Sequence, residues 1–320
     1  MKKIVLSVVA ALAVSAAPAF AADMPVKAVA APVAAPSPWD IAFGSAIMND
    51  YVFRGITQSN HKPSVAAYFE PRYNITKDIQ LYVGLSAESI SFLNRAAAEV
   101  DLYGGARWTI GPVVLDGGAW YYWYPGGQCY NSAVFCNTAN FPLNGNTMKA
   151  DVSFWEVYFK PTWNVNDQLA IGGNLFYTNS FLHSGAPGTY ISGTVKYTAS
   201  DKMAIGPFGW YVSGEFGRQY LGTTDAFYGL LGTVNGPGIN YADYDTWNVG
   251  LGLTWKVFTL DLRYSGTDLS KGDCNAFTGD FGASGISNVT AINPGGLGSN
   301  WCGSTFIAKL SADLTLGSLK

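Results

Sequence analysis

The chain has 320 residues, of which 48% are hydrophobic and 13% are charged, and its formal net charge at pH 7 is -3. An average soluble domain is about 25% charged, and no run of basic residues stands out here, so a highly charged disordered chain and a nucleic-acid-binding protein are both disfavoured. The 37 Gly, 19 Tyr and 10 Trp favour strands and turns over helices, because glycine destabilises a helix interior, so an all-β fold is expected.

Residues 1–21 have the three parts of a secretory signal peptide. Two lysines follow the first methionine, an apolar run covers 4–17, and an Ala-Phe-Ala triplet at 19–21 offers the small residues that a signal peptidase accepts. The alternative, a membrane anchor, is disfavoured because the apolar run is shorter than the roughly 20 residues of a spanning helix and Pro18 follows it. We therefore expect an exported protein.

Residues 22–38 are almost all Ala, Pro and Val, a composition typical of extended, polyproline-like segments. We interpret them as a flexible periplasmic leader. The remainder, 39–320, is expected to form one domain.

From Trp39 onward, apolar and polar residues alternate as they do in strands. In residues 153–160, one face of a strand would carry Trp155, Val157 and Phe159, and the other would carry Glu156 and Lys160. The same alternation of odd and even positions between the two faces, which we call parity, recurs around residues 80–86, 99–107, 258–264 and 306–316. A soluble β-sandwich would show the same alternation, so this pattern alone leaves the architecture open.

The connections between the candidate strands alternate between short and long. Short turns are expected near 75–78, 109–112, 164–167, 199–202 and 256–257, and long loops near 59–63, 89–97, 125–150, 179–187, 217–243 and 266–303. This asymmetry is typical of bacterial outer-membrane barrels. The sequence therefore predicts a transmembrane, antiparallel, up-and-down β-barrel of about 12 strands, with short periplasmic turns and long extracellular loops.

Large aromatic residues gather beside the short turns, where a barrel would need a girdle at the level of the lipid headgroups. The alternative is that they form the core of a soluble β domain, which would then have to accommodate charges on one face of almost every strand. The positions are Trp39, Tyr73, Trp108, Trp163, Tyr197, Trp255 and Phe258.

Two segments carry a family resemblance. The sequence N-D-Y-V-F-R-G-I-T-Q at 49–58 resembles the opening motif of the TorF-type porin family of proteobacterial outer-membrane β-barrels, and F-W-E-V-Y at 154–158 is similar to an internal strand of that family with a central Glu. The resemblance extends from about Trp39 to the end and implies an outer-membrane pore. Outer-membrane barrels usually end on Phe or Trp, whereas this chain ends on Lys320, a departure that bears on recognition by the barrel-assembly machinery.

Parity also assigns the charges to the barrel interior. In the first motif it places Asp50 and Arg54 on the watery face of the first strand and Tyr51 and Phe53 toward lipid; an Arg facing lipid at mid-depth would cost about 2–4 kcal/mol. These charges either create a field that selects solutes or neutralise one another in a narrow barrel. The predicted pore-lining residues are Asp50, Arg54, Glu70, Arg72, Asp101, Arg107, Glu156, Lys160, Asp261, Arg263, Lys309 and Asp313.

The four cysteines fall in two long loops. Cys129 and Cys136 share one loop and Cys274 and Cys302 share another, so we predict two loop-local disulfides in an oxidising compartment. A metal site is not expected, because the spacings lack Cys-x-x-Cys and both histidines, His61 and His183, lie in other loops.

No catalytic constellation stands out, so we expect no enzyme and no cofactor. The favoured function is an outer-membrane porin of a Gram-negative cell that lets small hydrophilic solutes or ions diffuse passively, with outer-membrane lipid and the barrel-assembly machinery as partners and no nucleic acid. One alternative is a closed-lumen adhesin, with Tyr122, Trp123, Tyr124, Phe227 and Tyr228 as aromatic anchors. A less favoured alternative is an enzyme similar to outer-membrane phospholipase, which would need a Ser-His-Asn set at the lipid-facing rim.

Overall fold

The computed structural model describes residues 38–129, 148–228, 238–278, 280, 282–285, 287, 293 and 295–319. The expected signal peptide and all of the expected leader except Pro38 lie outside these residues. Within the described part, no helix combines the length and the apolar character that a bilayer crossing requires.

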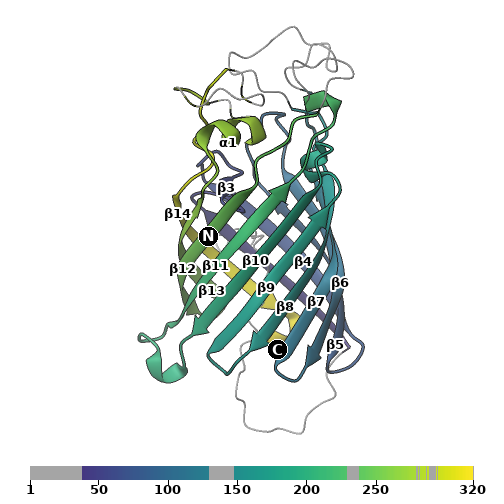
Figure 1. The fold of residues 1–320 in the computed structure, drawn as a ribbon. Coiled ribbons are helices and arrows are strands. Elements are labelled where there is room, and N and C mark those ends of the chain that lie inside the picture. Colours follow the sequence, from purple (N-terminus) through teal and green to yellow (C-terminus); the bar gives the residue numbers. More distant parts are fainter. Residues whose placement is uncertain are drawn as a thin grey trace, which may run out of the picture.

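Twelve antiparallel strands form a closed barrel (Figure 1). Each strand pairs with its neighbours along the chain, and β1 closes the barrel against β14, with Ala42 opposite Thr315. The predicted all-β, up-and-down architecture is thereby confirmed. The strands are β1 (Trp39–Met48), β4 (Ser64–Asn74), β5 (Ile79–Glu88), β6 (Glu99–Ile110), β7 (Val113–Trp123), β8 (Phe154–Asn164), β9 (Leu169–Thr178), β10 (Gly188–Thr198), β11 (Gly209–Leu221), β12 (Tyr244–Trp255), β13 (Phe258–Thr267) and β14 (Thr305–Thr315).

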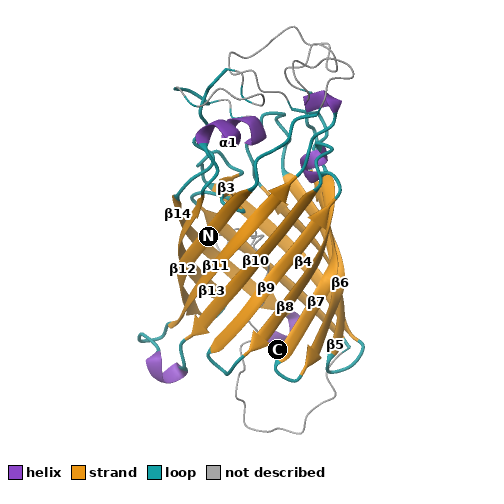
Figure 2. Ribbon diagram, in the orientation of Figure 1, coloured by secondary structure: helices purple, strands orange, loops and turns teal. Residues whose placement is uncertain are grey.

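The two ends of the barrel differ as expected (Figure 2): short turns lie at the lower end in the view, and long loops with the helix α1 (Lys271–Thr278) lie at the upper end. We call these the short-turn end and the long-loop end. One expected short turn is longer than predicted, because residues 199–208 join β10 to β11 and include a 3-10 turn, Asp201–Met203. The helix α1 was not predicted from the sequence.

The outer surface of the barrel is apolar. In β8, Trp155, Val157 and Phe159 are exposed, whereas Glu156 between them is fully buried inside, as parity predicted. The girdle aromatics are exposed, with the exception of Tyr197, which is half-buried beside Trp210. A core of a soluble β domain would bury these groups, so that alternative is wrong for this chain.

The segment after β1 departs from the predicted strand. A small hairpin of β2 (Val52–Phe53) and β3 (Ile56–Thr57) turns at Arg54 and Gly55, both with positive φ. A side chain at Gly55 would lie 2.9 Å from the backbone oxygen of Gly266, so this close approach requires glycine.

The prediction that Tyr51 and Phe53 face lipid is wrong. Tyr51 is 7% exposed and donates a hydrogen bond to Glu99, and Phe53 packs edge-on against Tyr122. Parity fails here because β1 ends at Met48 and the chain then folds inward, so the alternation of residues 50–54 no longer belongs to a barrel strand.

Candidate pore lining and loop plug

Four charges from β4, β6 and β7 meet on the inner wall near the short-turn end. Arg107 binds Glu70 at 2.9 Å and Asp116 at 3.3 Å, and Arg72 Nε lies 2.6 Å from the same Glu70 oxygen. Lys160 of β8 lies opposite Asp116 in the strand register. We call Glu70, Arg72, Arg107 and Asp116 the β4–β7 charge cluster. Parity correctly predicted that Glu70, Arg72 and Arg107 face the barrel interior.

A second group comes from β13 and β14. Arg263 makes a two-pronged contact with Asp261, at 3.0 Å from Nε and 2.9 Å from Nη2, and Tyr211 donates to Asp261 at 2.6 Å. Lys309 stands opposite Asp261 in the register of the two strands. Asp261, Arg263 and Lys309 form the β13–β14 charge cluster. Asp313, nearer the end of β14, accepts hydrogen bonds from Tyr68 and Ser311.

The two clusters lie on neighbouring parts of the inner wall, because only β1 separates β4 from β14, and Tyr68 of β4 donates a hydrogen bond to Asp313 of β14. Both keep contact with solvent: the side chains of Arg107 and Asp116 are 20% and 16% exposed, and that of Arg263 is 22% exposed. Charges of both signs therefore face the interior at the short-turn end.

A third charged group lies nearer the long-loop end and is buried from solvent. Arg54, at the tip of the β2–β3 hairpin, binds Glu156 of β8 through two hydrogen bonds of 2.9 and 2.7 Å and Gln219 of β11 through one of 2.9 Å. The side chains of Arg54 and Glu156 are 5% and 0% exposed. The guanidinium also lies 4.5 Å from the Tyr190 ring centroid, a cation–π arrangement. The hairpin thus joins the β1 side of the barrel to the β8 and β11 walls.

Gln219 belongs to this group but was not predicted. It is fully buried, yet it is uncharged, so a search for lumen charges passes over it. The signal that could have found it is parity: Phe216 and Tyr220 are exposed on the outer face, which places position 219 inward.

Asp50 and Asp101 were both predicted to line the pore; Asp50 lies beyond the end of β1, whereas Asp101 does face inward, from β6. Asp50 is buried beneath the loop that follows the hairpin, where Thr57, Ser59 and His61 bind it. Asp101 is also buried, and its described partner is Ser86 at 3.0 Å rather than an arginine.

An apolar core fills the long-loop end. It combines the β2–β3 hairpin, the described parts of the loops and the inward residues at the upper ends of strands, and we call it the loop plug. Within it, Tyr122 stacks on Phe154 with ring centroids 4.5 Å apart, and Phe154 contacts Phe181. Its buried members are Ile56, Phe92, Leu93, Ala96, Tyr122, Tyr124, Met148, Val152, Phe154, Phe181, Ala186, Leu221, Tyr241, Tyr244, Cys274, Trp301 and Cys302.

The residues proposed as exposed aromatic anchors are therefore differently placed. Tyr122, Tyr124 and Phe227 are buried, while Trp123 is exposed on the outer face of β7. None of these four side chains offers an anchor on the surface of the long loops. Their aromatic character is explained by packing in the plug and on the outer wall.

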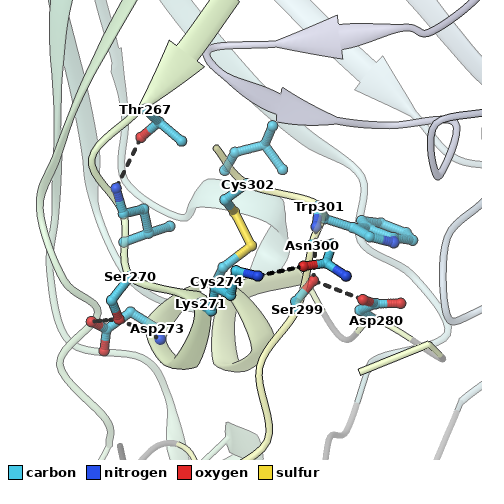
Figure 3. Close-up of a disulfide and its surroundings, with 12 residues drawn as sticks. Thr267, Ser270, Lys271, Asp273, Cys274, Asp280, Ser299, Asn300, Trp301 and Cys302 are labelled. Carbon is cyan, nitrogen blue, oxygen red and sulfur yellow. Dashed lines mark hydrogen bonds between the residues drawn. A yellow bond between two sulfur atoms is a disulfide. The ribbon is translucent and has the colours of Figure 1, made fainter. Parts of the chain in front are cut away.

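A disulfide fastens part of the plug (Figure 3). Cys274 on α1 is bonded to Cys302, with Cα atoms 5.9 Å apart, and Lys271 of the same helix donates a hydrogen bond to Asn300. This pairing confirms the prediction for the second long loop. The other predicted pairing, Cys129 with Cys136, lies outside the described residues because position 136 is not among them.

His61 links two loop segments. Its Nδ1 lies 2.6 Å from Asp50 and its Nε2 lies 2.7 Å from the backbone oxygen of Asn300. Because both partners are acceptors, the ring must carry both protons to bind them, and the hydrogen bond to Asp50 raises the pKa of His61 above its usual value. His61 lies in a loop, as predicted, but it bridges two segments instead of standing free in solvent. His183 is exposed and lies 3.6 Å from Asp151.

In a comparison with protein families, the family described as "Bacterial protein of unknown function (Gcw_chp)" matches residues 32–293. No curated protein matches the chain. Among solved structures, LpxR from Salmonella typhimurium shows a TM-score of 0.40 at 10% identity, covering 86% of this chain and 99% of that one. A NanC porin gives 0.38 at 8%, covering 85% and 97%, and a loop-deletion mutant of OmpT, an outer membrane protein of Vibrio cholerae, gives 0.37 at 10%, covering 86% and 99%. Likenesses this weak carry no information on activity.

Proposed function

We propose that this chain, which belongs to the Gcw_chp family of bacterial proteins of unknown function, is an outer-membrane porin for small hydrophilic solutes or ions whose long-loop end is closed by the loop plug. We place it in the outer membrane of a Gram-negative cell and infer passive diffusion, without a cofactor or a chemical step. The TorF-type porin resemblance of residues 49–58 agrees with this proposal.

The outer face supports a membrane location. Large apolar side chains are exposed on the barrel strands, for example Val83 at 62% and Phe216 at 59%. Burying such a surface in lipid is favourable by roughly 25 cal/mol per Å², whereas in water it would promote aggregation. A closed barrel also leaves no strand edge unpaired, which is the condition for crossing the hydrocarbon with strands.

The observation that carries the pore proposal is the pair of partly exposed, mixed-sign charge clusters on the inner wall at the short-turn end. A barrel that served only as a scaffold could fill its interior with apolar side chains and avoid the cost of desolvating charges. Charges of both signs that retain solvent contact can instead bind and release hydrated ions or polar solutes.

The loop plug implies that conduction requires a rearrangement at the long-loop end. The plug is held by side-chain packing among the hairpin, the loops and inward residues at the upper ends of the strands, while the barrel wall is held by its own strand ladders, so the plug can loosen without opening the wall. We therefore propose a gated pore rather than a permanently open one.

The plug also favours a second candidate, a closed-lumen interaction barrel that presents its long loops to a partner. The two candidates differ in whether solute ever crosses the barrel. The buried positions of Tyr122, Tyr124 and Phe227 remove three of the five aromatic anchors that this candidate first relied on, so we rank it second.

Liposome swelling tests the porin proposal. Vesicles that contain the refolded mature protein are diluted into solutions of neutral, cationic and anionic solutes of increasing size. We expect swelling with small solutes, and a changed preference between cations and anions in Asp261→Asn. The matched control is Asp78→Asn, which removes a charge from an exposed turn at the same end. Folded protein that passes no solute of any size would refute the porin and leave the interaction barrel.

A further inference from the structure

Three carboxylates meet inside the barrel where β5 ends and β6 begins. Glu88 and Glu99 are direct partners in the strand register, and Asp101 pairs with Ser86 two residues further down. One oxygen from each of Glu88, Glu99 and Asp101 lies within 4.8 Å of the others. Antiparallel pairing places all three on the same inner face, so the strand register itself produces the cluster.

The cluster is buried and carries no counter-charge. Glu88, Glu99 and Asp101 are 1%, 2% and 2% exposed. Among the described residues, no arginine, lysine or histidine forms an ion pair with any of the three. Buried like charges in direct contact repel strongly unless a cation or protons neutralise them.

The hydrogen bonds around the cluster leave specific oxygens unsatisfied. Tyr51 and Tyr124 donate to the two oxygens of Glu99 at 2.6 and 2.8 Å. Both oxygens of Glu88 and Oδ1 of Asp101 are buried without a hydrogen-bond partner in the protein. A buried carboxylate without donors is costly, so the structure points to a ligand that these oxygens bind.

We propose that Glu88, Glu99 and Asp101 bind a divalent cation of the Ca²⁺ type. Calcium takes oxygen ligands at 2.3–2.6 Å, so two oxygens on one ion lie at most about 5.2 Å apart, and the observed separations fit that limit. The ligand set is composed of oxygen alone, which suits a hard cation better than zinc. Glu88 can bind through both of its oxygens, an arrangement that Ca²⁺ accepts more readily than octahedral Mg²⁺ does.

The ion would connect the wall to the loop plug. Glu99 already binds Tyr51, which precedes the β2–β3 hairpin, and Tyr124, a plug residue that directly follows β7. Neutralising the three charges beneath these residues stabilises the hairpin and the plug together. Removal of the cation is therefore expected to loosen the long-loop end while the strand ladders persist.

The test is Ca²⁺ binding to the refolded mature protein in detergent micelles after chelation. We expect one saturable site by isothermal titration calorimetry and a Ca²⁺-dependent rise in the unfolding temperature. Terbium should bind in place of calcium and luminesce when the aromatic residues are excited, because Tyr51 and Tyr124 donate hydrogen bonds to Glu99, one of the proposed metal ligands. Calcium should then displace the terbium.

Glu88→Gln is the main variant, because this side chain has no protein hydrogen bond to lose, and it should weaken Ca²⁺ binding about tenfold or more. The matched control is Glu215→Gln, which changes another interior carboxylate, one that already accepts bonds from Tyr190, Asn174 and Asn248. It should bind Ca²⁺ as the wild type does.

Two results would overturn the proposal. One is wild-type protein whose unfolding temperature and calorimetric signal do not respond to Ca²⁺ at neutral pH, which would mean that shared protons neutralise the cluster. The other is equal loss of binding in both variants. The wild-type measurements stand even if Glu88→Gln fails to fold, and they are independent of conductance, so a failed porin proposal would not affect them.

Discussion

The buried pair of Arg54 and Glu156 gives the sharpest prediction about stability. Replacing Arg54 with Gln leaves the Glu156 carboxylate, which is 0% exposed, without its cation. Breaking a buried ion pair from one side costs about 3–5 kcal/mol, and here the loss includes two charge-assisted hydrogen bonds and the contacts of the guanidinium with aromatic rings. We expect Arg54→Gln to lower the free energy of unfolding by that amount.

Glu156→Gln should be costly for the same reason, because it leaves the arginine unpaired. In the double variant, two amides can bind each other without a buried charge, so the combined loss should be smaller than the sum by about 2 kcal/mol or more. The assay is urea unfolding of the protein refolded into lipid vesicles, followed by tryptophan fluorescence. Single losses below about 1 kcal/mol that add up in the double variant would refute the structural importance of this pair.

Three further predictions concern the wall, the plug and the loops. Val83→Arg puts a charge on the outward face in the middle of β5 and should lower stability in lipid by about 2–4 kcal/mol, while Val83→Leu should change it little; equal stability in vesicle urea titrations would contradict a lipid-facing wall. Joint replacement of Cys274 and Cys302 by Ser removes a constraint of about 2–4 kcal/mol from the plug and should raise the frequency of channel openings in bilayer recordings; an unchanged frequency from a folded barrel would count against plug gating. The pKa of His61 is raised in the folded protein, so its contribution to the free energy of unfolding is present below about pH 6.5 and disappears as the pH rises through the folded pKa. The stabilisation should stay under about 1 kcal/mol because the ring is partly exposed, and a difference in unfolding temperature from His61→Gln that grew with pH would contradict it.

The wall of the barrel could be predicted from sequence because each strand repeats one local rule. Trp155, Val157 and Phe159 face outward and Glu156 faces inward because neighbouring residues of a strand point to opposite faces, whatever the rest of the chain does. The number of strands could be predicted for the same reason. Each short or long connection is recognisable from its own stretch of sequence, and counting the connections gives the number of strands.

The interior could be predicted only in part, because its contacts join distant segments. Parity placed Arg107 and Asp261 inside, but it gives the face and not the partner, and the contact of Arg54 with Glu156 spans 102 positions of the sequence. The inward hairpin escaped prediction because residues 50–54 continue the alternation after the strand has ended. The meeting of Glu88 with Glu99 depends on the register across a long loop, which the sequence does not display.

Single-channel recording in a planar bilayer under a salt gradient tests the central claim most directly. The refolded mature protein should give discrete openings, and Asp261→Asn and Arg107→Gln should shift the reversal potential in opposite directions, because they remove charges of opposite sign from the lumen. Asp78→Asn should leave the reversal potential unchanged. A folded barrel that never conducts, with its disulfide intact or removed, would contradict the pore and make the closed interaction barrel the better account.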